Sequence, residues 1–274
     1  MVNFEILCVT MHQNDFSKIN EMNIHTNVVF ANQCDCTTYD EYCFEGYTAK
    51  MISTQTRGVG INRNLALMYA SAKYCLLADD DVIYYDNVEQ LVVSEFEAHP
   101  DADVIIFHLD SDNKTRELKK FKHTKRWHRY NGLPVGGVRI AFKLESIRKA
   151  NTYFSMLFGG GSIFSSGEDS LFLIALARMG ERLYLSKETI GKVSFASSSW
   201  FCGFNERYYY GKGAFYQAAR PSLKYLWMLY LLVRTYNKNE LRFTEKLRWM
   251  NYGAKGYKSL LSFEQFCTEK GITL

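Results

Sequence analysis

Three consecutive carboxylates stand where an apolar run of the sequence ends. Residues 76–78 (Leu-Leu-Ala) lead directly into Asp79, Asp80 and Asp81. Adjacent carboxylates repel one another, so gathering them costs free energy unless a cation or hydrogen-bond donors compensate. Hard oxygen ligands from few protein groups suit Mg²⁺ or Mn²⁺ ions that are also held by a substrate's phosphates. The triplet therefore indicates a metal site; a solvated acidic turn that caps the next helix is the alternative.

A glycine-containing turn precedes an amphipathic segment upstream of the triplet. Gly58 and Gly60 lie between two basic residues, Arg57 and Arg63. Glycines let the backbone approach a ligand closely, and the N-terminus of a helix favours anions. Arg57 and Arg63 are therefore candidates for contacts with a diphosphate or a ribose, while an ordinary arginine on a helix surface is the alternative for Arg63.

A second acidic group lies further along the chain. Glu168 and Asp169 open an apolar segment and follow a glycine run at residues 159–161. Acidic residues in the first turn of a helix stabilise it by about 0.3 to 1 kcal/mol, so helix capping alone is one interpretation. The other is a general base, because a carboxylate can take the proton from an attacking hydroxyl group.

The order of these features resembles the family 2 glycosyltransferases. The resemblance rests on the segment from Arg57 through residues 62–66 (Asn-Arg-Asn-Leu-Ala) and on the acidic triplet, and it extends over residues 4 to 220. It implies a GT-A fold and a nucleotide-diphosphate sugar as donor. It also implies that Asp79 lies near the nucleoside and that Asp81, with Asp79, holds a metal ion, Mn²⁺ or Mg²⁺, that bridges the diphosphate. Asp80 is the third expected residue of this donor site.

The resemblance extends to both sides of the expected site. An acidic residue after the second strand is expected near the nucleoside, and Asp35 matches that position, with a loop aspartate as the alternative. Thr10, at the end of the first strand, is another expected nucleoside contact. On the acceptor side the resemblance implies inversion at the anomeric carbon, with Asp169 as the base and Glu168 orienting it or binding the acceptor.

Three further residues are expected at the acceptor side. Gly160 and Gly161 have no side chains, so they leave room for a sugar beside Glu168 and Asp169. Trp200 follows three serines and is a candidate for stacking on a sugar ring, with a core tryptophan as an equal alternative.

The elements that must position these residues follow from the hydrophobic pattern. Residues 61–71 carry apolar side chains at the spacing of an amphipathic helix. Expected strands cover residues 5–10, 27–31, 50–53, 74–78 and 104–108, and expected helices cover 61–71, 86–98 and 170–179. Alternating strands and helices predict an α/β fold with a mainly parallel, Rossmann-like central sheet flanked by helices.

The second half of the chain changes in character, which predicts a helical extension. Residues 1–215 are expected to form the catalytic domain, with a nucleotide-binding half at 1–110 and an acceptor-binding half at 111–215. Residues 216–274 are expected to form a helical C-terminal extension of two or three helices, the first of them strongly apolar.

Composition and charge limit the kinds of partner that the protein is expected to bind. The net charge of +4 is mild, and the basic residues that cluster at 114–129 form one local segment without a nucleic-acid-binding motif. We therefore expect no nucleic acid partner. No apolar stretch reaches the roughly 20 residues that a membrane-spanning helix needs. Residues 221–234 are apolar and aromatic, so they are a candidate for peripheral membrane contact or for packing against another surface.

The cysteines and the N-terminus favour a cytoplasmic location, with the inner face of the membrane as a second possibility. Seven cysteines are an odd number, and they lack the paired spacing of a zinc site, which is typical of reduced thiols. The first ten residues lack the pattern of a signal peptide.

The sequence as a whole predicts a metal-dependent, inverting glycosyltransferase. A UDP-sugar is the favoured donor, and a saccharide or a lipid-linked saccharide of cell-surface glycan synthesis is the expected acceptor. A sugar-phosphate nucleotidyltransferase is an alternative, although residues 11–15 lack the glycine-rich loop expected there. A non-catalytic binding or assembly protein is a third reading.

Overall fold

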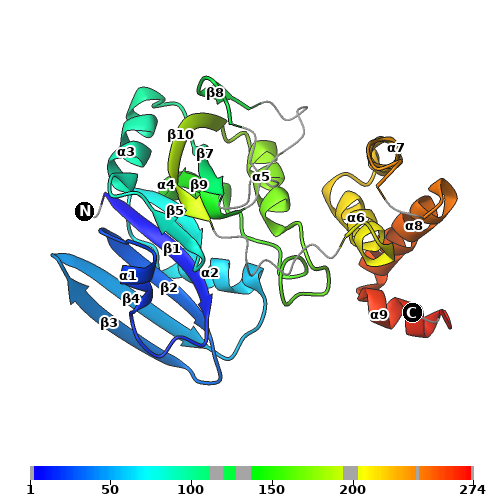
Figure 1. The fold of residues 1–274 in the computed structure, drawn as a ribbon, viewed down its shortest axis with the longest axis horizontal. Helices are drawn as coiled ribbons and strands as arrows, with labels where there is room; N and C mark the ends of the chain where they lie inside the picture. Colours follow the sequence, from blue (N-terminus) through cyan, green and yellow to red (C-terminus); the bar gives the residue numbers. More distant parts are fainter. Residues whose placement is uncertain (1–2, 112–119, 128–136, 194–202, 239–240, 273–274) are drawn as a thin grey trace.

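The protein is described by a computed structural model that covers residues 3–111, 120–127, 137–193, 203–238 and 241–272. Its described part consists of a sheet flanked by helices and, beside it, a group of C-terminal helices (Figure 1). This arrangement confirms the predicted α/β fold with a helical extension.

Within the described residues the sheet has ten strands, and six of them run in the same direction. Its order is β3-β4-β2-β1-β5-β9-β7-β10-β6, and β8 pairs with β10. The strands are β1 (Phe4–Met11), β2 (Asn27–Gln33), β3 (Thr38–Phe44), β4 (Tyr47–Thr54), β5 (Tyr74–Asp79), β6 (Val82–Tyr84), β7 (Val104–Ser111), β8 (Lys125–Arg126), β9 (Ile140–Lys143) and β10 (Leu183–Val193).

The parallel part of the sheet fixes where the chemistry lies. β1 pairs in parallel with both β2 and β5, and β2 pairs in parallel with β4. β9 is inserted antiparallel between β5 and β7, whereas β10 runs parallel to β7. The carboxyl ends of β1, β2, β4 and β5 therefore meet at one edge, which is where open α/β sheets bind ligands.

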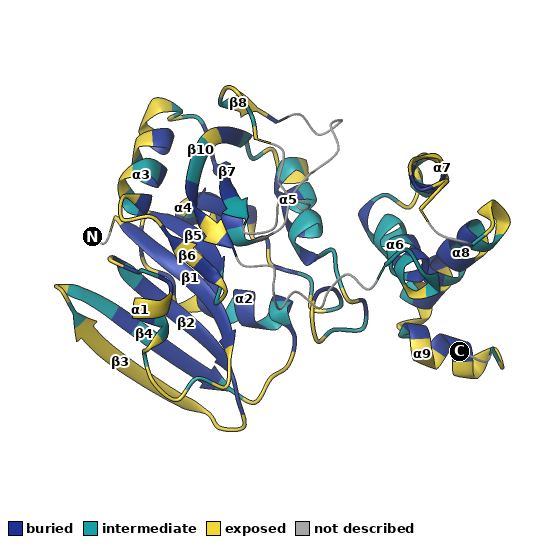
Figure 2. Ribbon diagram, in the orientation of Figure 1, coloured by how far each residue is buried: buried dark blue, intermediate teal, exposed yellow. Residues whose placement is uncertain are grey.

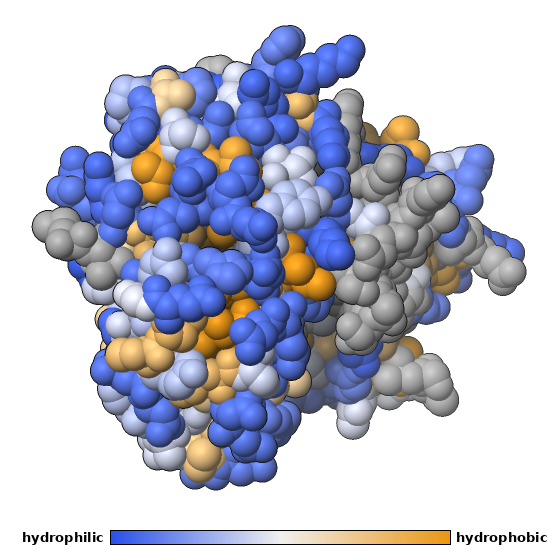
Figure 3. All heavy atoms as spheres, turned by 60° about the vertical axis from the view of Figure 1, so that its left-hand side comes forward, coloured by the Kyte–Doolittle hydropathy of each residue, from blue (hydrophilic) through white to orange (hydrophobic). Residues whose placement is uncertain are grey.

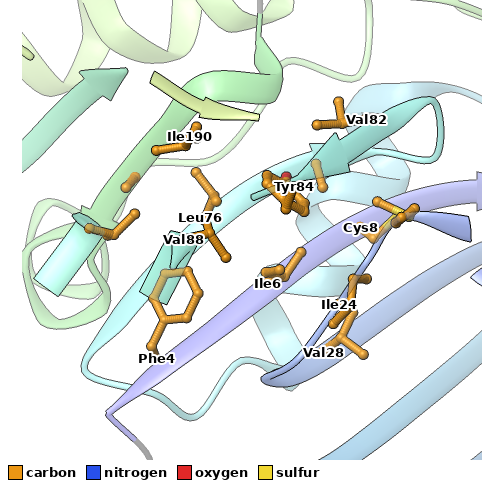
Figure 4. Packing of buried hydrophobic residues seen from close by; sticks show 14 of the residues in the cluster. Phe4, Ile6, Cys8, Ile24, Val28, Leu76, Val82, Tyr84, Val88 and Ile190 are labelled. Atoms are coloured by element: carbon orange, nitrogen blue, oxygen red, sulfur yellow. The ribbon is translucent and has the colours of Figure 1, made fainter. Parts of the chain in front are cut away.

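Helices cover both faces of the sheet, as continuous apolar strands require. On one face, α1 (Lys18–Glu21) and α3 (Val88–Ala98) pack on the side chains of Phe4, Ile6 and Cys8 (Figure 4). On the other face lie α2 (Val59–Tyr69), α4 (Leu144–Ala150) and α5 (Glu168–Met179). The strands between them are mostly buried (Figure 2).

The C-terminal helices form a separate core. They are α6 (Glu206–Ala219), α7 (Lys224–Arg234), α8 (Phe243–Ser259) and α9 (Phe263–Glu269). Two aromatic residues of the catalytic part, Phe158 and Phe164, belong to this same core, and both rings contact Tyr257 of α8. The boundary expected near residue 215 falls inside α6, and the helical unit begins with that helix.

Candidate active site

The acidic triplet lies at the end of β5, next to the ends of two neighbouring strands. Asp79 is the last residue of β5 and pairs with Val9 of β1. The Thr10 hydroxyl, buried at the end of β1, donates a hydrogen bond to the Asp80 carboxylate. The structure therefore brings Thr10 and the triplet together; their roles as nucleotide-sugar contacts stay predictions.

The charges of the triplet are only partly balanced. Asp79 accepts from Arg63 at 3.0 Å, and Asp80 accepts from Thr10. Partial withdrawal from solvent and the charges of Asp79 and Asp80 raise the pKa of Asp81 to about 6. The residue as a whole is exposed, so solvent screens part of this effect. No basic side chain in the described ranges forms an ion pair with Asp81.

Arg63 joins the two acidic groups. Its Nη2 contacts Asp79, and its Nη1 contacts Glu168 at 3.1 Å and also Asp169. Only 3% of the side chain is exposed, and the ring of Phe154 lies 5.5 Å from the guanidinium carbon. Burial lowers the pKa of Arg63, but the three carboxylates outweigh that effect and raise it. The guanidinium is therefore a charged bridge between segments that are about 90 residues apart.

The start of α5 carries the second acidic group. Gly167 precedes the helix with a φ of 120°, a conformation that favours glycine. The Glu168 side chain turns back, accepts the N–H of Gly167 at 3.0 Å and is buried. Asp169 reaches Arg63 from the next position. The two acidic residues thus occupy the first turn of α5, and through Arg63 they are also linked to Asp79 of the triplet.

The first turns of α2 position Arg63. The Asn62 amide donates to the carbonyl of Ala31 at 2.9 Å, which ties α2 to the end of β2. Asn64 both donates to and accepts from the backbone of Phe154, at 2.9 and 2.8 Å. A Cβ atom on Gly60 would lie 2.2 Å from the Ser155 carbonyl oxygen, so α2 approaches that segment as closely as glycine permits.

The two glycine segments pack on each other. The N–H of Val59 donates to the carbonyl of Gly160 at 2.9 Å, and the Cβ that Gly161 lacks would be 3.3 Å from Gly58. Gly159 adopts a φ of 107°, and a Cβ there would lie 2.9 Å from the Glu168 carboxyl carbon. Gly160, by contrast, has open space beside it, as expected of a residue that leaves room for a sugar.

Asp35 and Arg57 form an exposed pair beyond the end of β2. Arg57 Nη2 contacts Asp35 at 2.5 Å, while its Nη1 donates to the carbonyl of Cys34 at 2.9 Å. Gln33, at the end of β2, accepts the N–H of Gly58 at 2.7 Å. The two predicted nucleotide-sugar residues are therefore neighbours on the side of the site where β2 and the glycine turn meet.

Some positioning residues were not predicted from the sequence. Gln33, Asn62 and Asn64 use side-chain amides to tie the glycine turn and α2 to their surroundings. Asn62 and Asn64 flank Arg63 in the segment that carries the family resemblance. The sequence alone does not indicate which groups their side chains bind. Trp200 lies outside the described residues, as do residues 114–119 and 128–129 of the basic segment.

The donor set suits a hard divalent cation. Three carboxylates, those of Asp79, Glu168 and Asp169, contact one guanidinium, and the triplet adds Asp80 and Asp81 beside Asp79. Within the described ranges, no group of three or more His, Cys, Asp or Glu side chains is already arranged to hold a metal ion. Mg²⁺ and Mn²⁺ commonly use one or two carboxylates plus substrate phosphates, so the residues present fit such an ion.

Comparisons with known proteins agree with this arrangement. Residues 37–164 match the model of glycosyl transferase family 2. That match includes the triplet and the glycine run and ends just before Glu168. No curated protein sequence matches the chain.

Solved structures of similar fold include several of S. aureus TarS 1–349. One is 14% identical with a TM-score of 0.57, over 95% of this chain and 93% of that one. A complex with UDP-GlcNAc is 16% identical with a TM-score of 0.57, over 98% and 76% of the two chains. A complex with UDP is 16% identical with a TM-score of 0.56, over 94% and 72%. At this identity the likeness concerns the fold.

Residues 37–164, which include the acidic triplet and the glycine run, are therefore similar to glycosyl transferase family 2, and the mainly parallel sheet flanked by helices agrees with a GT-A fold. This confirms the resemblance drawn from the sequence, and the chain is a glycosyltransferase.

Proposed function

We propose that the protein transfers a sugar, with inversion and with the help of a divalent metal ion, from a UDP-sugar to a hydroxyl group of a saccharide or lipid-linked saccharide. The observation that carries the proposal is the convergence of two acidic groups, at the end of β5 and the start of α5, on the buried Arg63. One group is suited to a donor's diphosphate and its metal ion, and the other to an acceptor hydroxyl.

The donor side is proposed to lie along the ends of β1, β2 and β5. Thr10, Asp35 and Arg57 would contact the nucleoside end, and the glycine turn at Gly58 allows close approach of a ligand. UDP is the favoured nucleotide because S. aureus TarS, of similar fold, has been crystallised with UDP and with UDP-GlcNAc.

Asp79 and Asp81 would hold the metal ion, Mn²⁺ or Mg²⁺. When bound there, the ion supplies positive charge to the leaving diphosphate. Asp80 is kept in position by the Thr10 hydroxyl, and Arg63 orients Asp79 through its Nη2. These contacts reduce the freedom of two carboxylates and leave Asp81, which has no ion pair in the described ranges, facing outward.

Asp169 is proposed to take the proton from the acceptor hydroxyl as it attacks the anomeric carbon. Glu168 is buried and bound to Gly167 and Arg63, so it is better suited to holding the local structure than to moving a proton. Asp169 shares Arg63 with the donor-side Asp79, so the proposed base and the proposed donor site contact the same guanidinium.

The first experiment compares Asp169→Asn with Asp15→Asn, an exposed aspartate in the loop after β1. We expect Asp169→Asn to keep the thermal shift given by UDP-sugar with Mn²⁺ and to lose transfer by about 10²- to 10⁴-fold. Asp15→Asn should behave like the wild-type protein. Unchanged transfer by Asp169→Asn would remove this residue as the base.

The donor is identified by a thermal-shift series of UDP-, GDP- and dTDP-sugars, each with and without Mn²⁺. We expect a shift that requires both a UDP-sugar and the metal ion. Release of pyrophosphate from a nucleoside triphosphate would instead indicate a nucleotidyltransferase, and no shift with any nucleotide sugar would favour a non-catalytic binding protein.

A second proposal concerns location. We propose that the protein works in the cytoplasm at the inner face of the membrane, with the outer side of α7 on the lipid. Met228, Leu231 and Leu232 of α7 are buried against the helical core. The opposite side exposes large apolar and aromatic residues: Tyr225, Leu226, Leu229, Tyr230 and Val233, at 50% to 68%. The face of the molecule in Figure 3 is largely hydrophilic by comparison.

The positive charge of this helix and its flanking residues favours contact with a membrane that contains anionic lipids. Residues 220–238 contain two arginines and two lysines and no acidic residue. No helix of the described part is long and apolar enough to cross a bilayer, so the contact proposed is peripheral. Sedimentation with vesicles should show binding to phosphatidylglycerol that exceeds binding to phosphatidylcholine.

A double variant tests the residues of α7. Leu226→Ser with Val233→Ser should lose most vesicle binding, whereas Met68→Ser, an equally exposed change on α2, should not. Equal binding by all three proteins, or binding by none, would contradict the proposed contact.

A further inference from the structure

A lysine of the helical unit lies over an aromatic ring that packs at the start of α5, and it has no acidic partner among the described residues. Lys212 of α6 is partly buried, and its Nζ lies 5.4 Å from the ring centre of Tyr208 and 5.8 Å from that of Phe215. No carboxylate in the described ranges forms an ion pair with it. Cation–π contacts stabilise an ammonium group, but they leave its three N–H donors available.

Packing limits the rotation of α6, the helix that carries Lys212. A Cβ on Gly213 would lie 1.9 Å from the carbonyl oxygen of Met250, and one on Gly253 would lie 1.8 Å from that of Tyr210. α6 and α8 therefore touch backbone to backbone, which leaves little freedom for α6 to rotate. On the other side of α6, the ring of Phe215 would be 2.8 Å from a Cβ on Gly167, the residue before Glu168.

The negative charge of Glu168 acts on this ammonium group. Burial lowers the pKa of Lys212, and the negative charge of Glu168 opposes that change. Glu168 itself is already engaged by Arg63 and by the N–H of Gly167. A partly desolvated charge without a counterion is unfavourable, so binding an anion here would relieve a cost that the free protein carries.

We propose that Lys212 forms the anion-binding part of the acceptor site, and that the acceptor therefore carries a phosphate or carboxylate group near the hydroxyl that reacts. This inference rests on the proposed function, because it assumes that Glu168 and Asp169 mark the acceptor side. The donor-side residues Thr10, Asp35 and Asp79 lie at or just after the ends of β1, β2 and β5, whereas Lys212 belongs to the helical unit and lies over the ring of Phe215, which packs at the start of α5.

The test uses sugars that differ only in charge, as probes of the acceptor site. With the full chain saturated by UDP and Mn²⁺, titration calorimetry compares glucose with glucose 6-phosphate and with glucuronic acid. We expect at least one acidic sugar to bind about tenfold or more tightly than glucose, the effect of one charged hydrogen bond. The two acidic arms distinguish a phosphate from a carboxylate.

Three variants assign the effect to this side chain. Lys212→Met should lose the preference for the acidic sugar, and Lys212→Arg should keep most of it. Lys255→Met, which changes an exposed lysine of α8, should leave the preference intact. All four proteins should bind UDP with Mn²⁺ equally, which also shows that they are folded.

Two results would overturn the inference: no preference in the wild-type protein, or a preference that Lys212→Met retains. Failure of the wild-type protein to bind UDP would count against the proposed function instead, so the two failures are distinguishable.

Discussion

Asp81 shows how function and stability oppose each other in a single residue. Its carboxyl lies beside Asp79 and Asp80 and has no basic partner in the described ranges, so in the free protein it contributes mainly repulsion. Asp81→Asn should therefore leave the unfolding free energy of the free protein unchanged or raise it by up to about 1 kcal/mol. Its melting temperature should likewise stay the same or rise. If Mn²⁺ and a UDP-sugar bind as proposed, the same variant should lose the stabilisation that they give.

Differential scanning calorimetry with and without Mn²⁺ and UDP checks this prediction. A matched change, Asp86→Asn, neutralises an exposed aspartate near the triplet and should keep the response to the ligands. If Asp81→Asn retained the full ligand-induced shift, Asp81 would not be a metal ligand.

His108 makes stability depend on pH. The side chain is fully buried in β7, and its Nε2 accepts the N–H of Phe121 at 2.8 Å, so the neutral ring is the folded form. Burial, with the charges of Arg139 and Lys120, lowers its pKa from 6.5 to about 4. An unfolded chain takes up a proton below pH 6.5 that the folded chain excludes. The contribution of His108 is therefore complete above about pH 6.5 and is lost as pH falls towards about 4.

Denaturation in urea from pH 7 to pH 4 measures this dependence. The difference in stability between the wild-type protein and His108→Gln should narrow by up to about 3 kcal/mol as the pH falls. The exposed His123→Gln should show no such change. Parallel curves for wild type and His108→Gln would contradict the prediction.

Much of the site could be predicted at the level of residue type. Asp79 and Asp169 were assigned from their positions at the end of a strand and the start of a helix, and the structure brings both to one arginine. The contacts of Arg63 with Glu168 and Asp169 could not be predicted, because these residues are 105 and 106 positions away and their approach depends on how the segments pack. The contacts of the Gln33 and Asn62 amides, 25 and 31 positions away, likewise depend on the packing of separate elements.

At the level of elements, the glycines of the two loops allow α2 to lie very close to the neighbouring backbone. Gly60→Ala would place a Cβ 2.2 Å from the Ser155 carbonyl oxygen, and neither backbone can move without disturbing Asn64 and Phe154. We expect a loss of about 1 to 3 kcal/mol of unfolding free energy and a larger loss of activity, since Arg63 shifts with the helix.

Thermal unfolding together with donor affinity tests the role of Gly60. Gly160→Ala is the stability control, because a Cβ there meets nothing within 4 Å. A Gly60→Ala protein as stable as Gly160→Ala would show that the close approach of α2 to Ser155 is not tight.

The pattern of apolar residues predicted some strands and helices correctly but missed other strands. β1, β2, β4, β5 and β7 were expected because they are buried apolar runs, and α2, α3 and α5 because of their helical spacing. β3 was missed because every residue from Thr38 to Cys43 is exposed, so the strand carries no apolar face. β9 was missed because it has only four residues, and β10 because polar residues interrupt it.

At the scale of the whole molecule, the helical unit is joined to the catalytic part through a shared aromatic core. Phe158 and Phe164 pack with Tyr257, and Arg178 of α5 donates to the carbonyl of Ala219 in α6. The expected boundary near residue 215 followed a change in composition, but α6 packs along its length on α8, a contact that no composition reveals.

The close contact of α6 with α8 should therefore control the helical unit. Gly253→Ala places a Cβ 1.8 Å from the Tyr210 carbonyl oxygen and should separate the helices, costing about 1 to 3 kcal/mol or more. Hydrogen exchange should show loss of protection in α6 and α8 before the sheet. In Gly211→Ala, whose Cβ meets nothing, exchange should stay the same or slow slightly. Uniform exchange in Gly253→Ala would indicate that the two units open together.

The ion pairs of Arg63 restrict which substitutions the chain can accept during evolution. Its guanidinium is balanced by Asp79 on one segment and by Glu168 and Asp169 on another. Loss of any one acid leaves a buried positive charge undercompensated, and loss of the arginine leaves three acids without their counterion. A homologue that lost this chemistry would need substitutions in both segments at almost the same time. Arg63 and its three acidic partners are therefore more easily conserved together than replaced one by one.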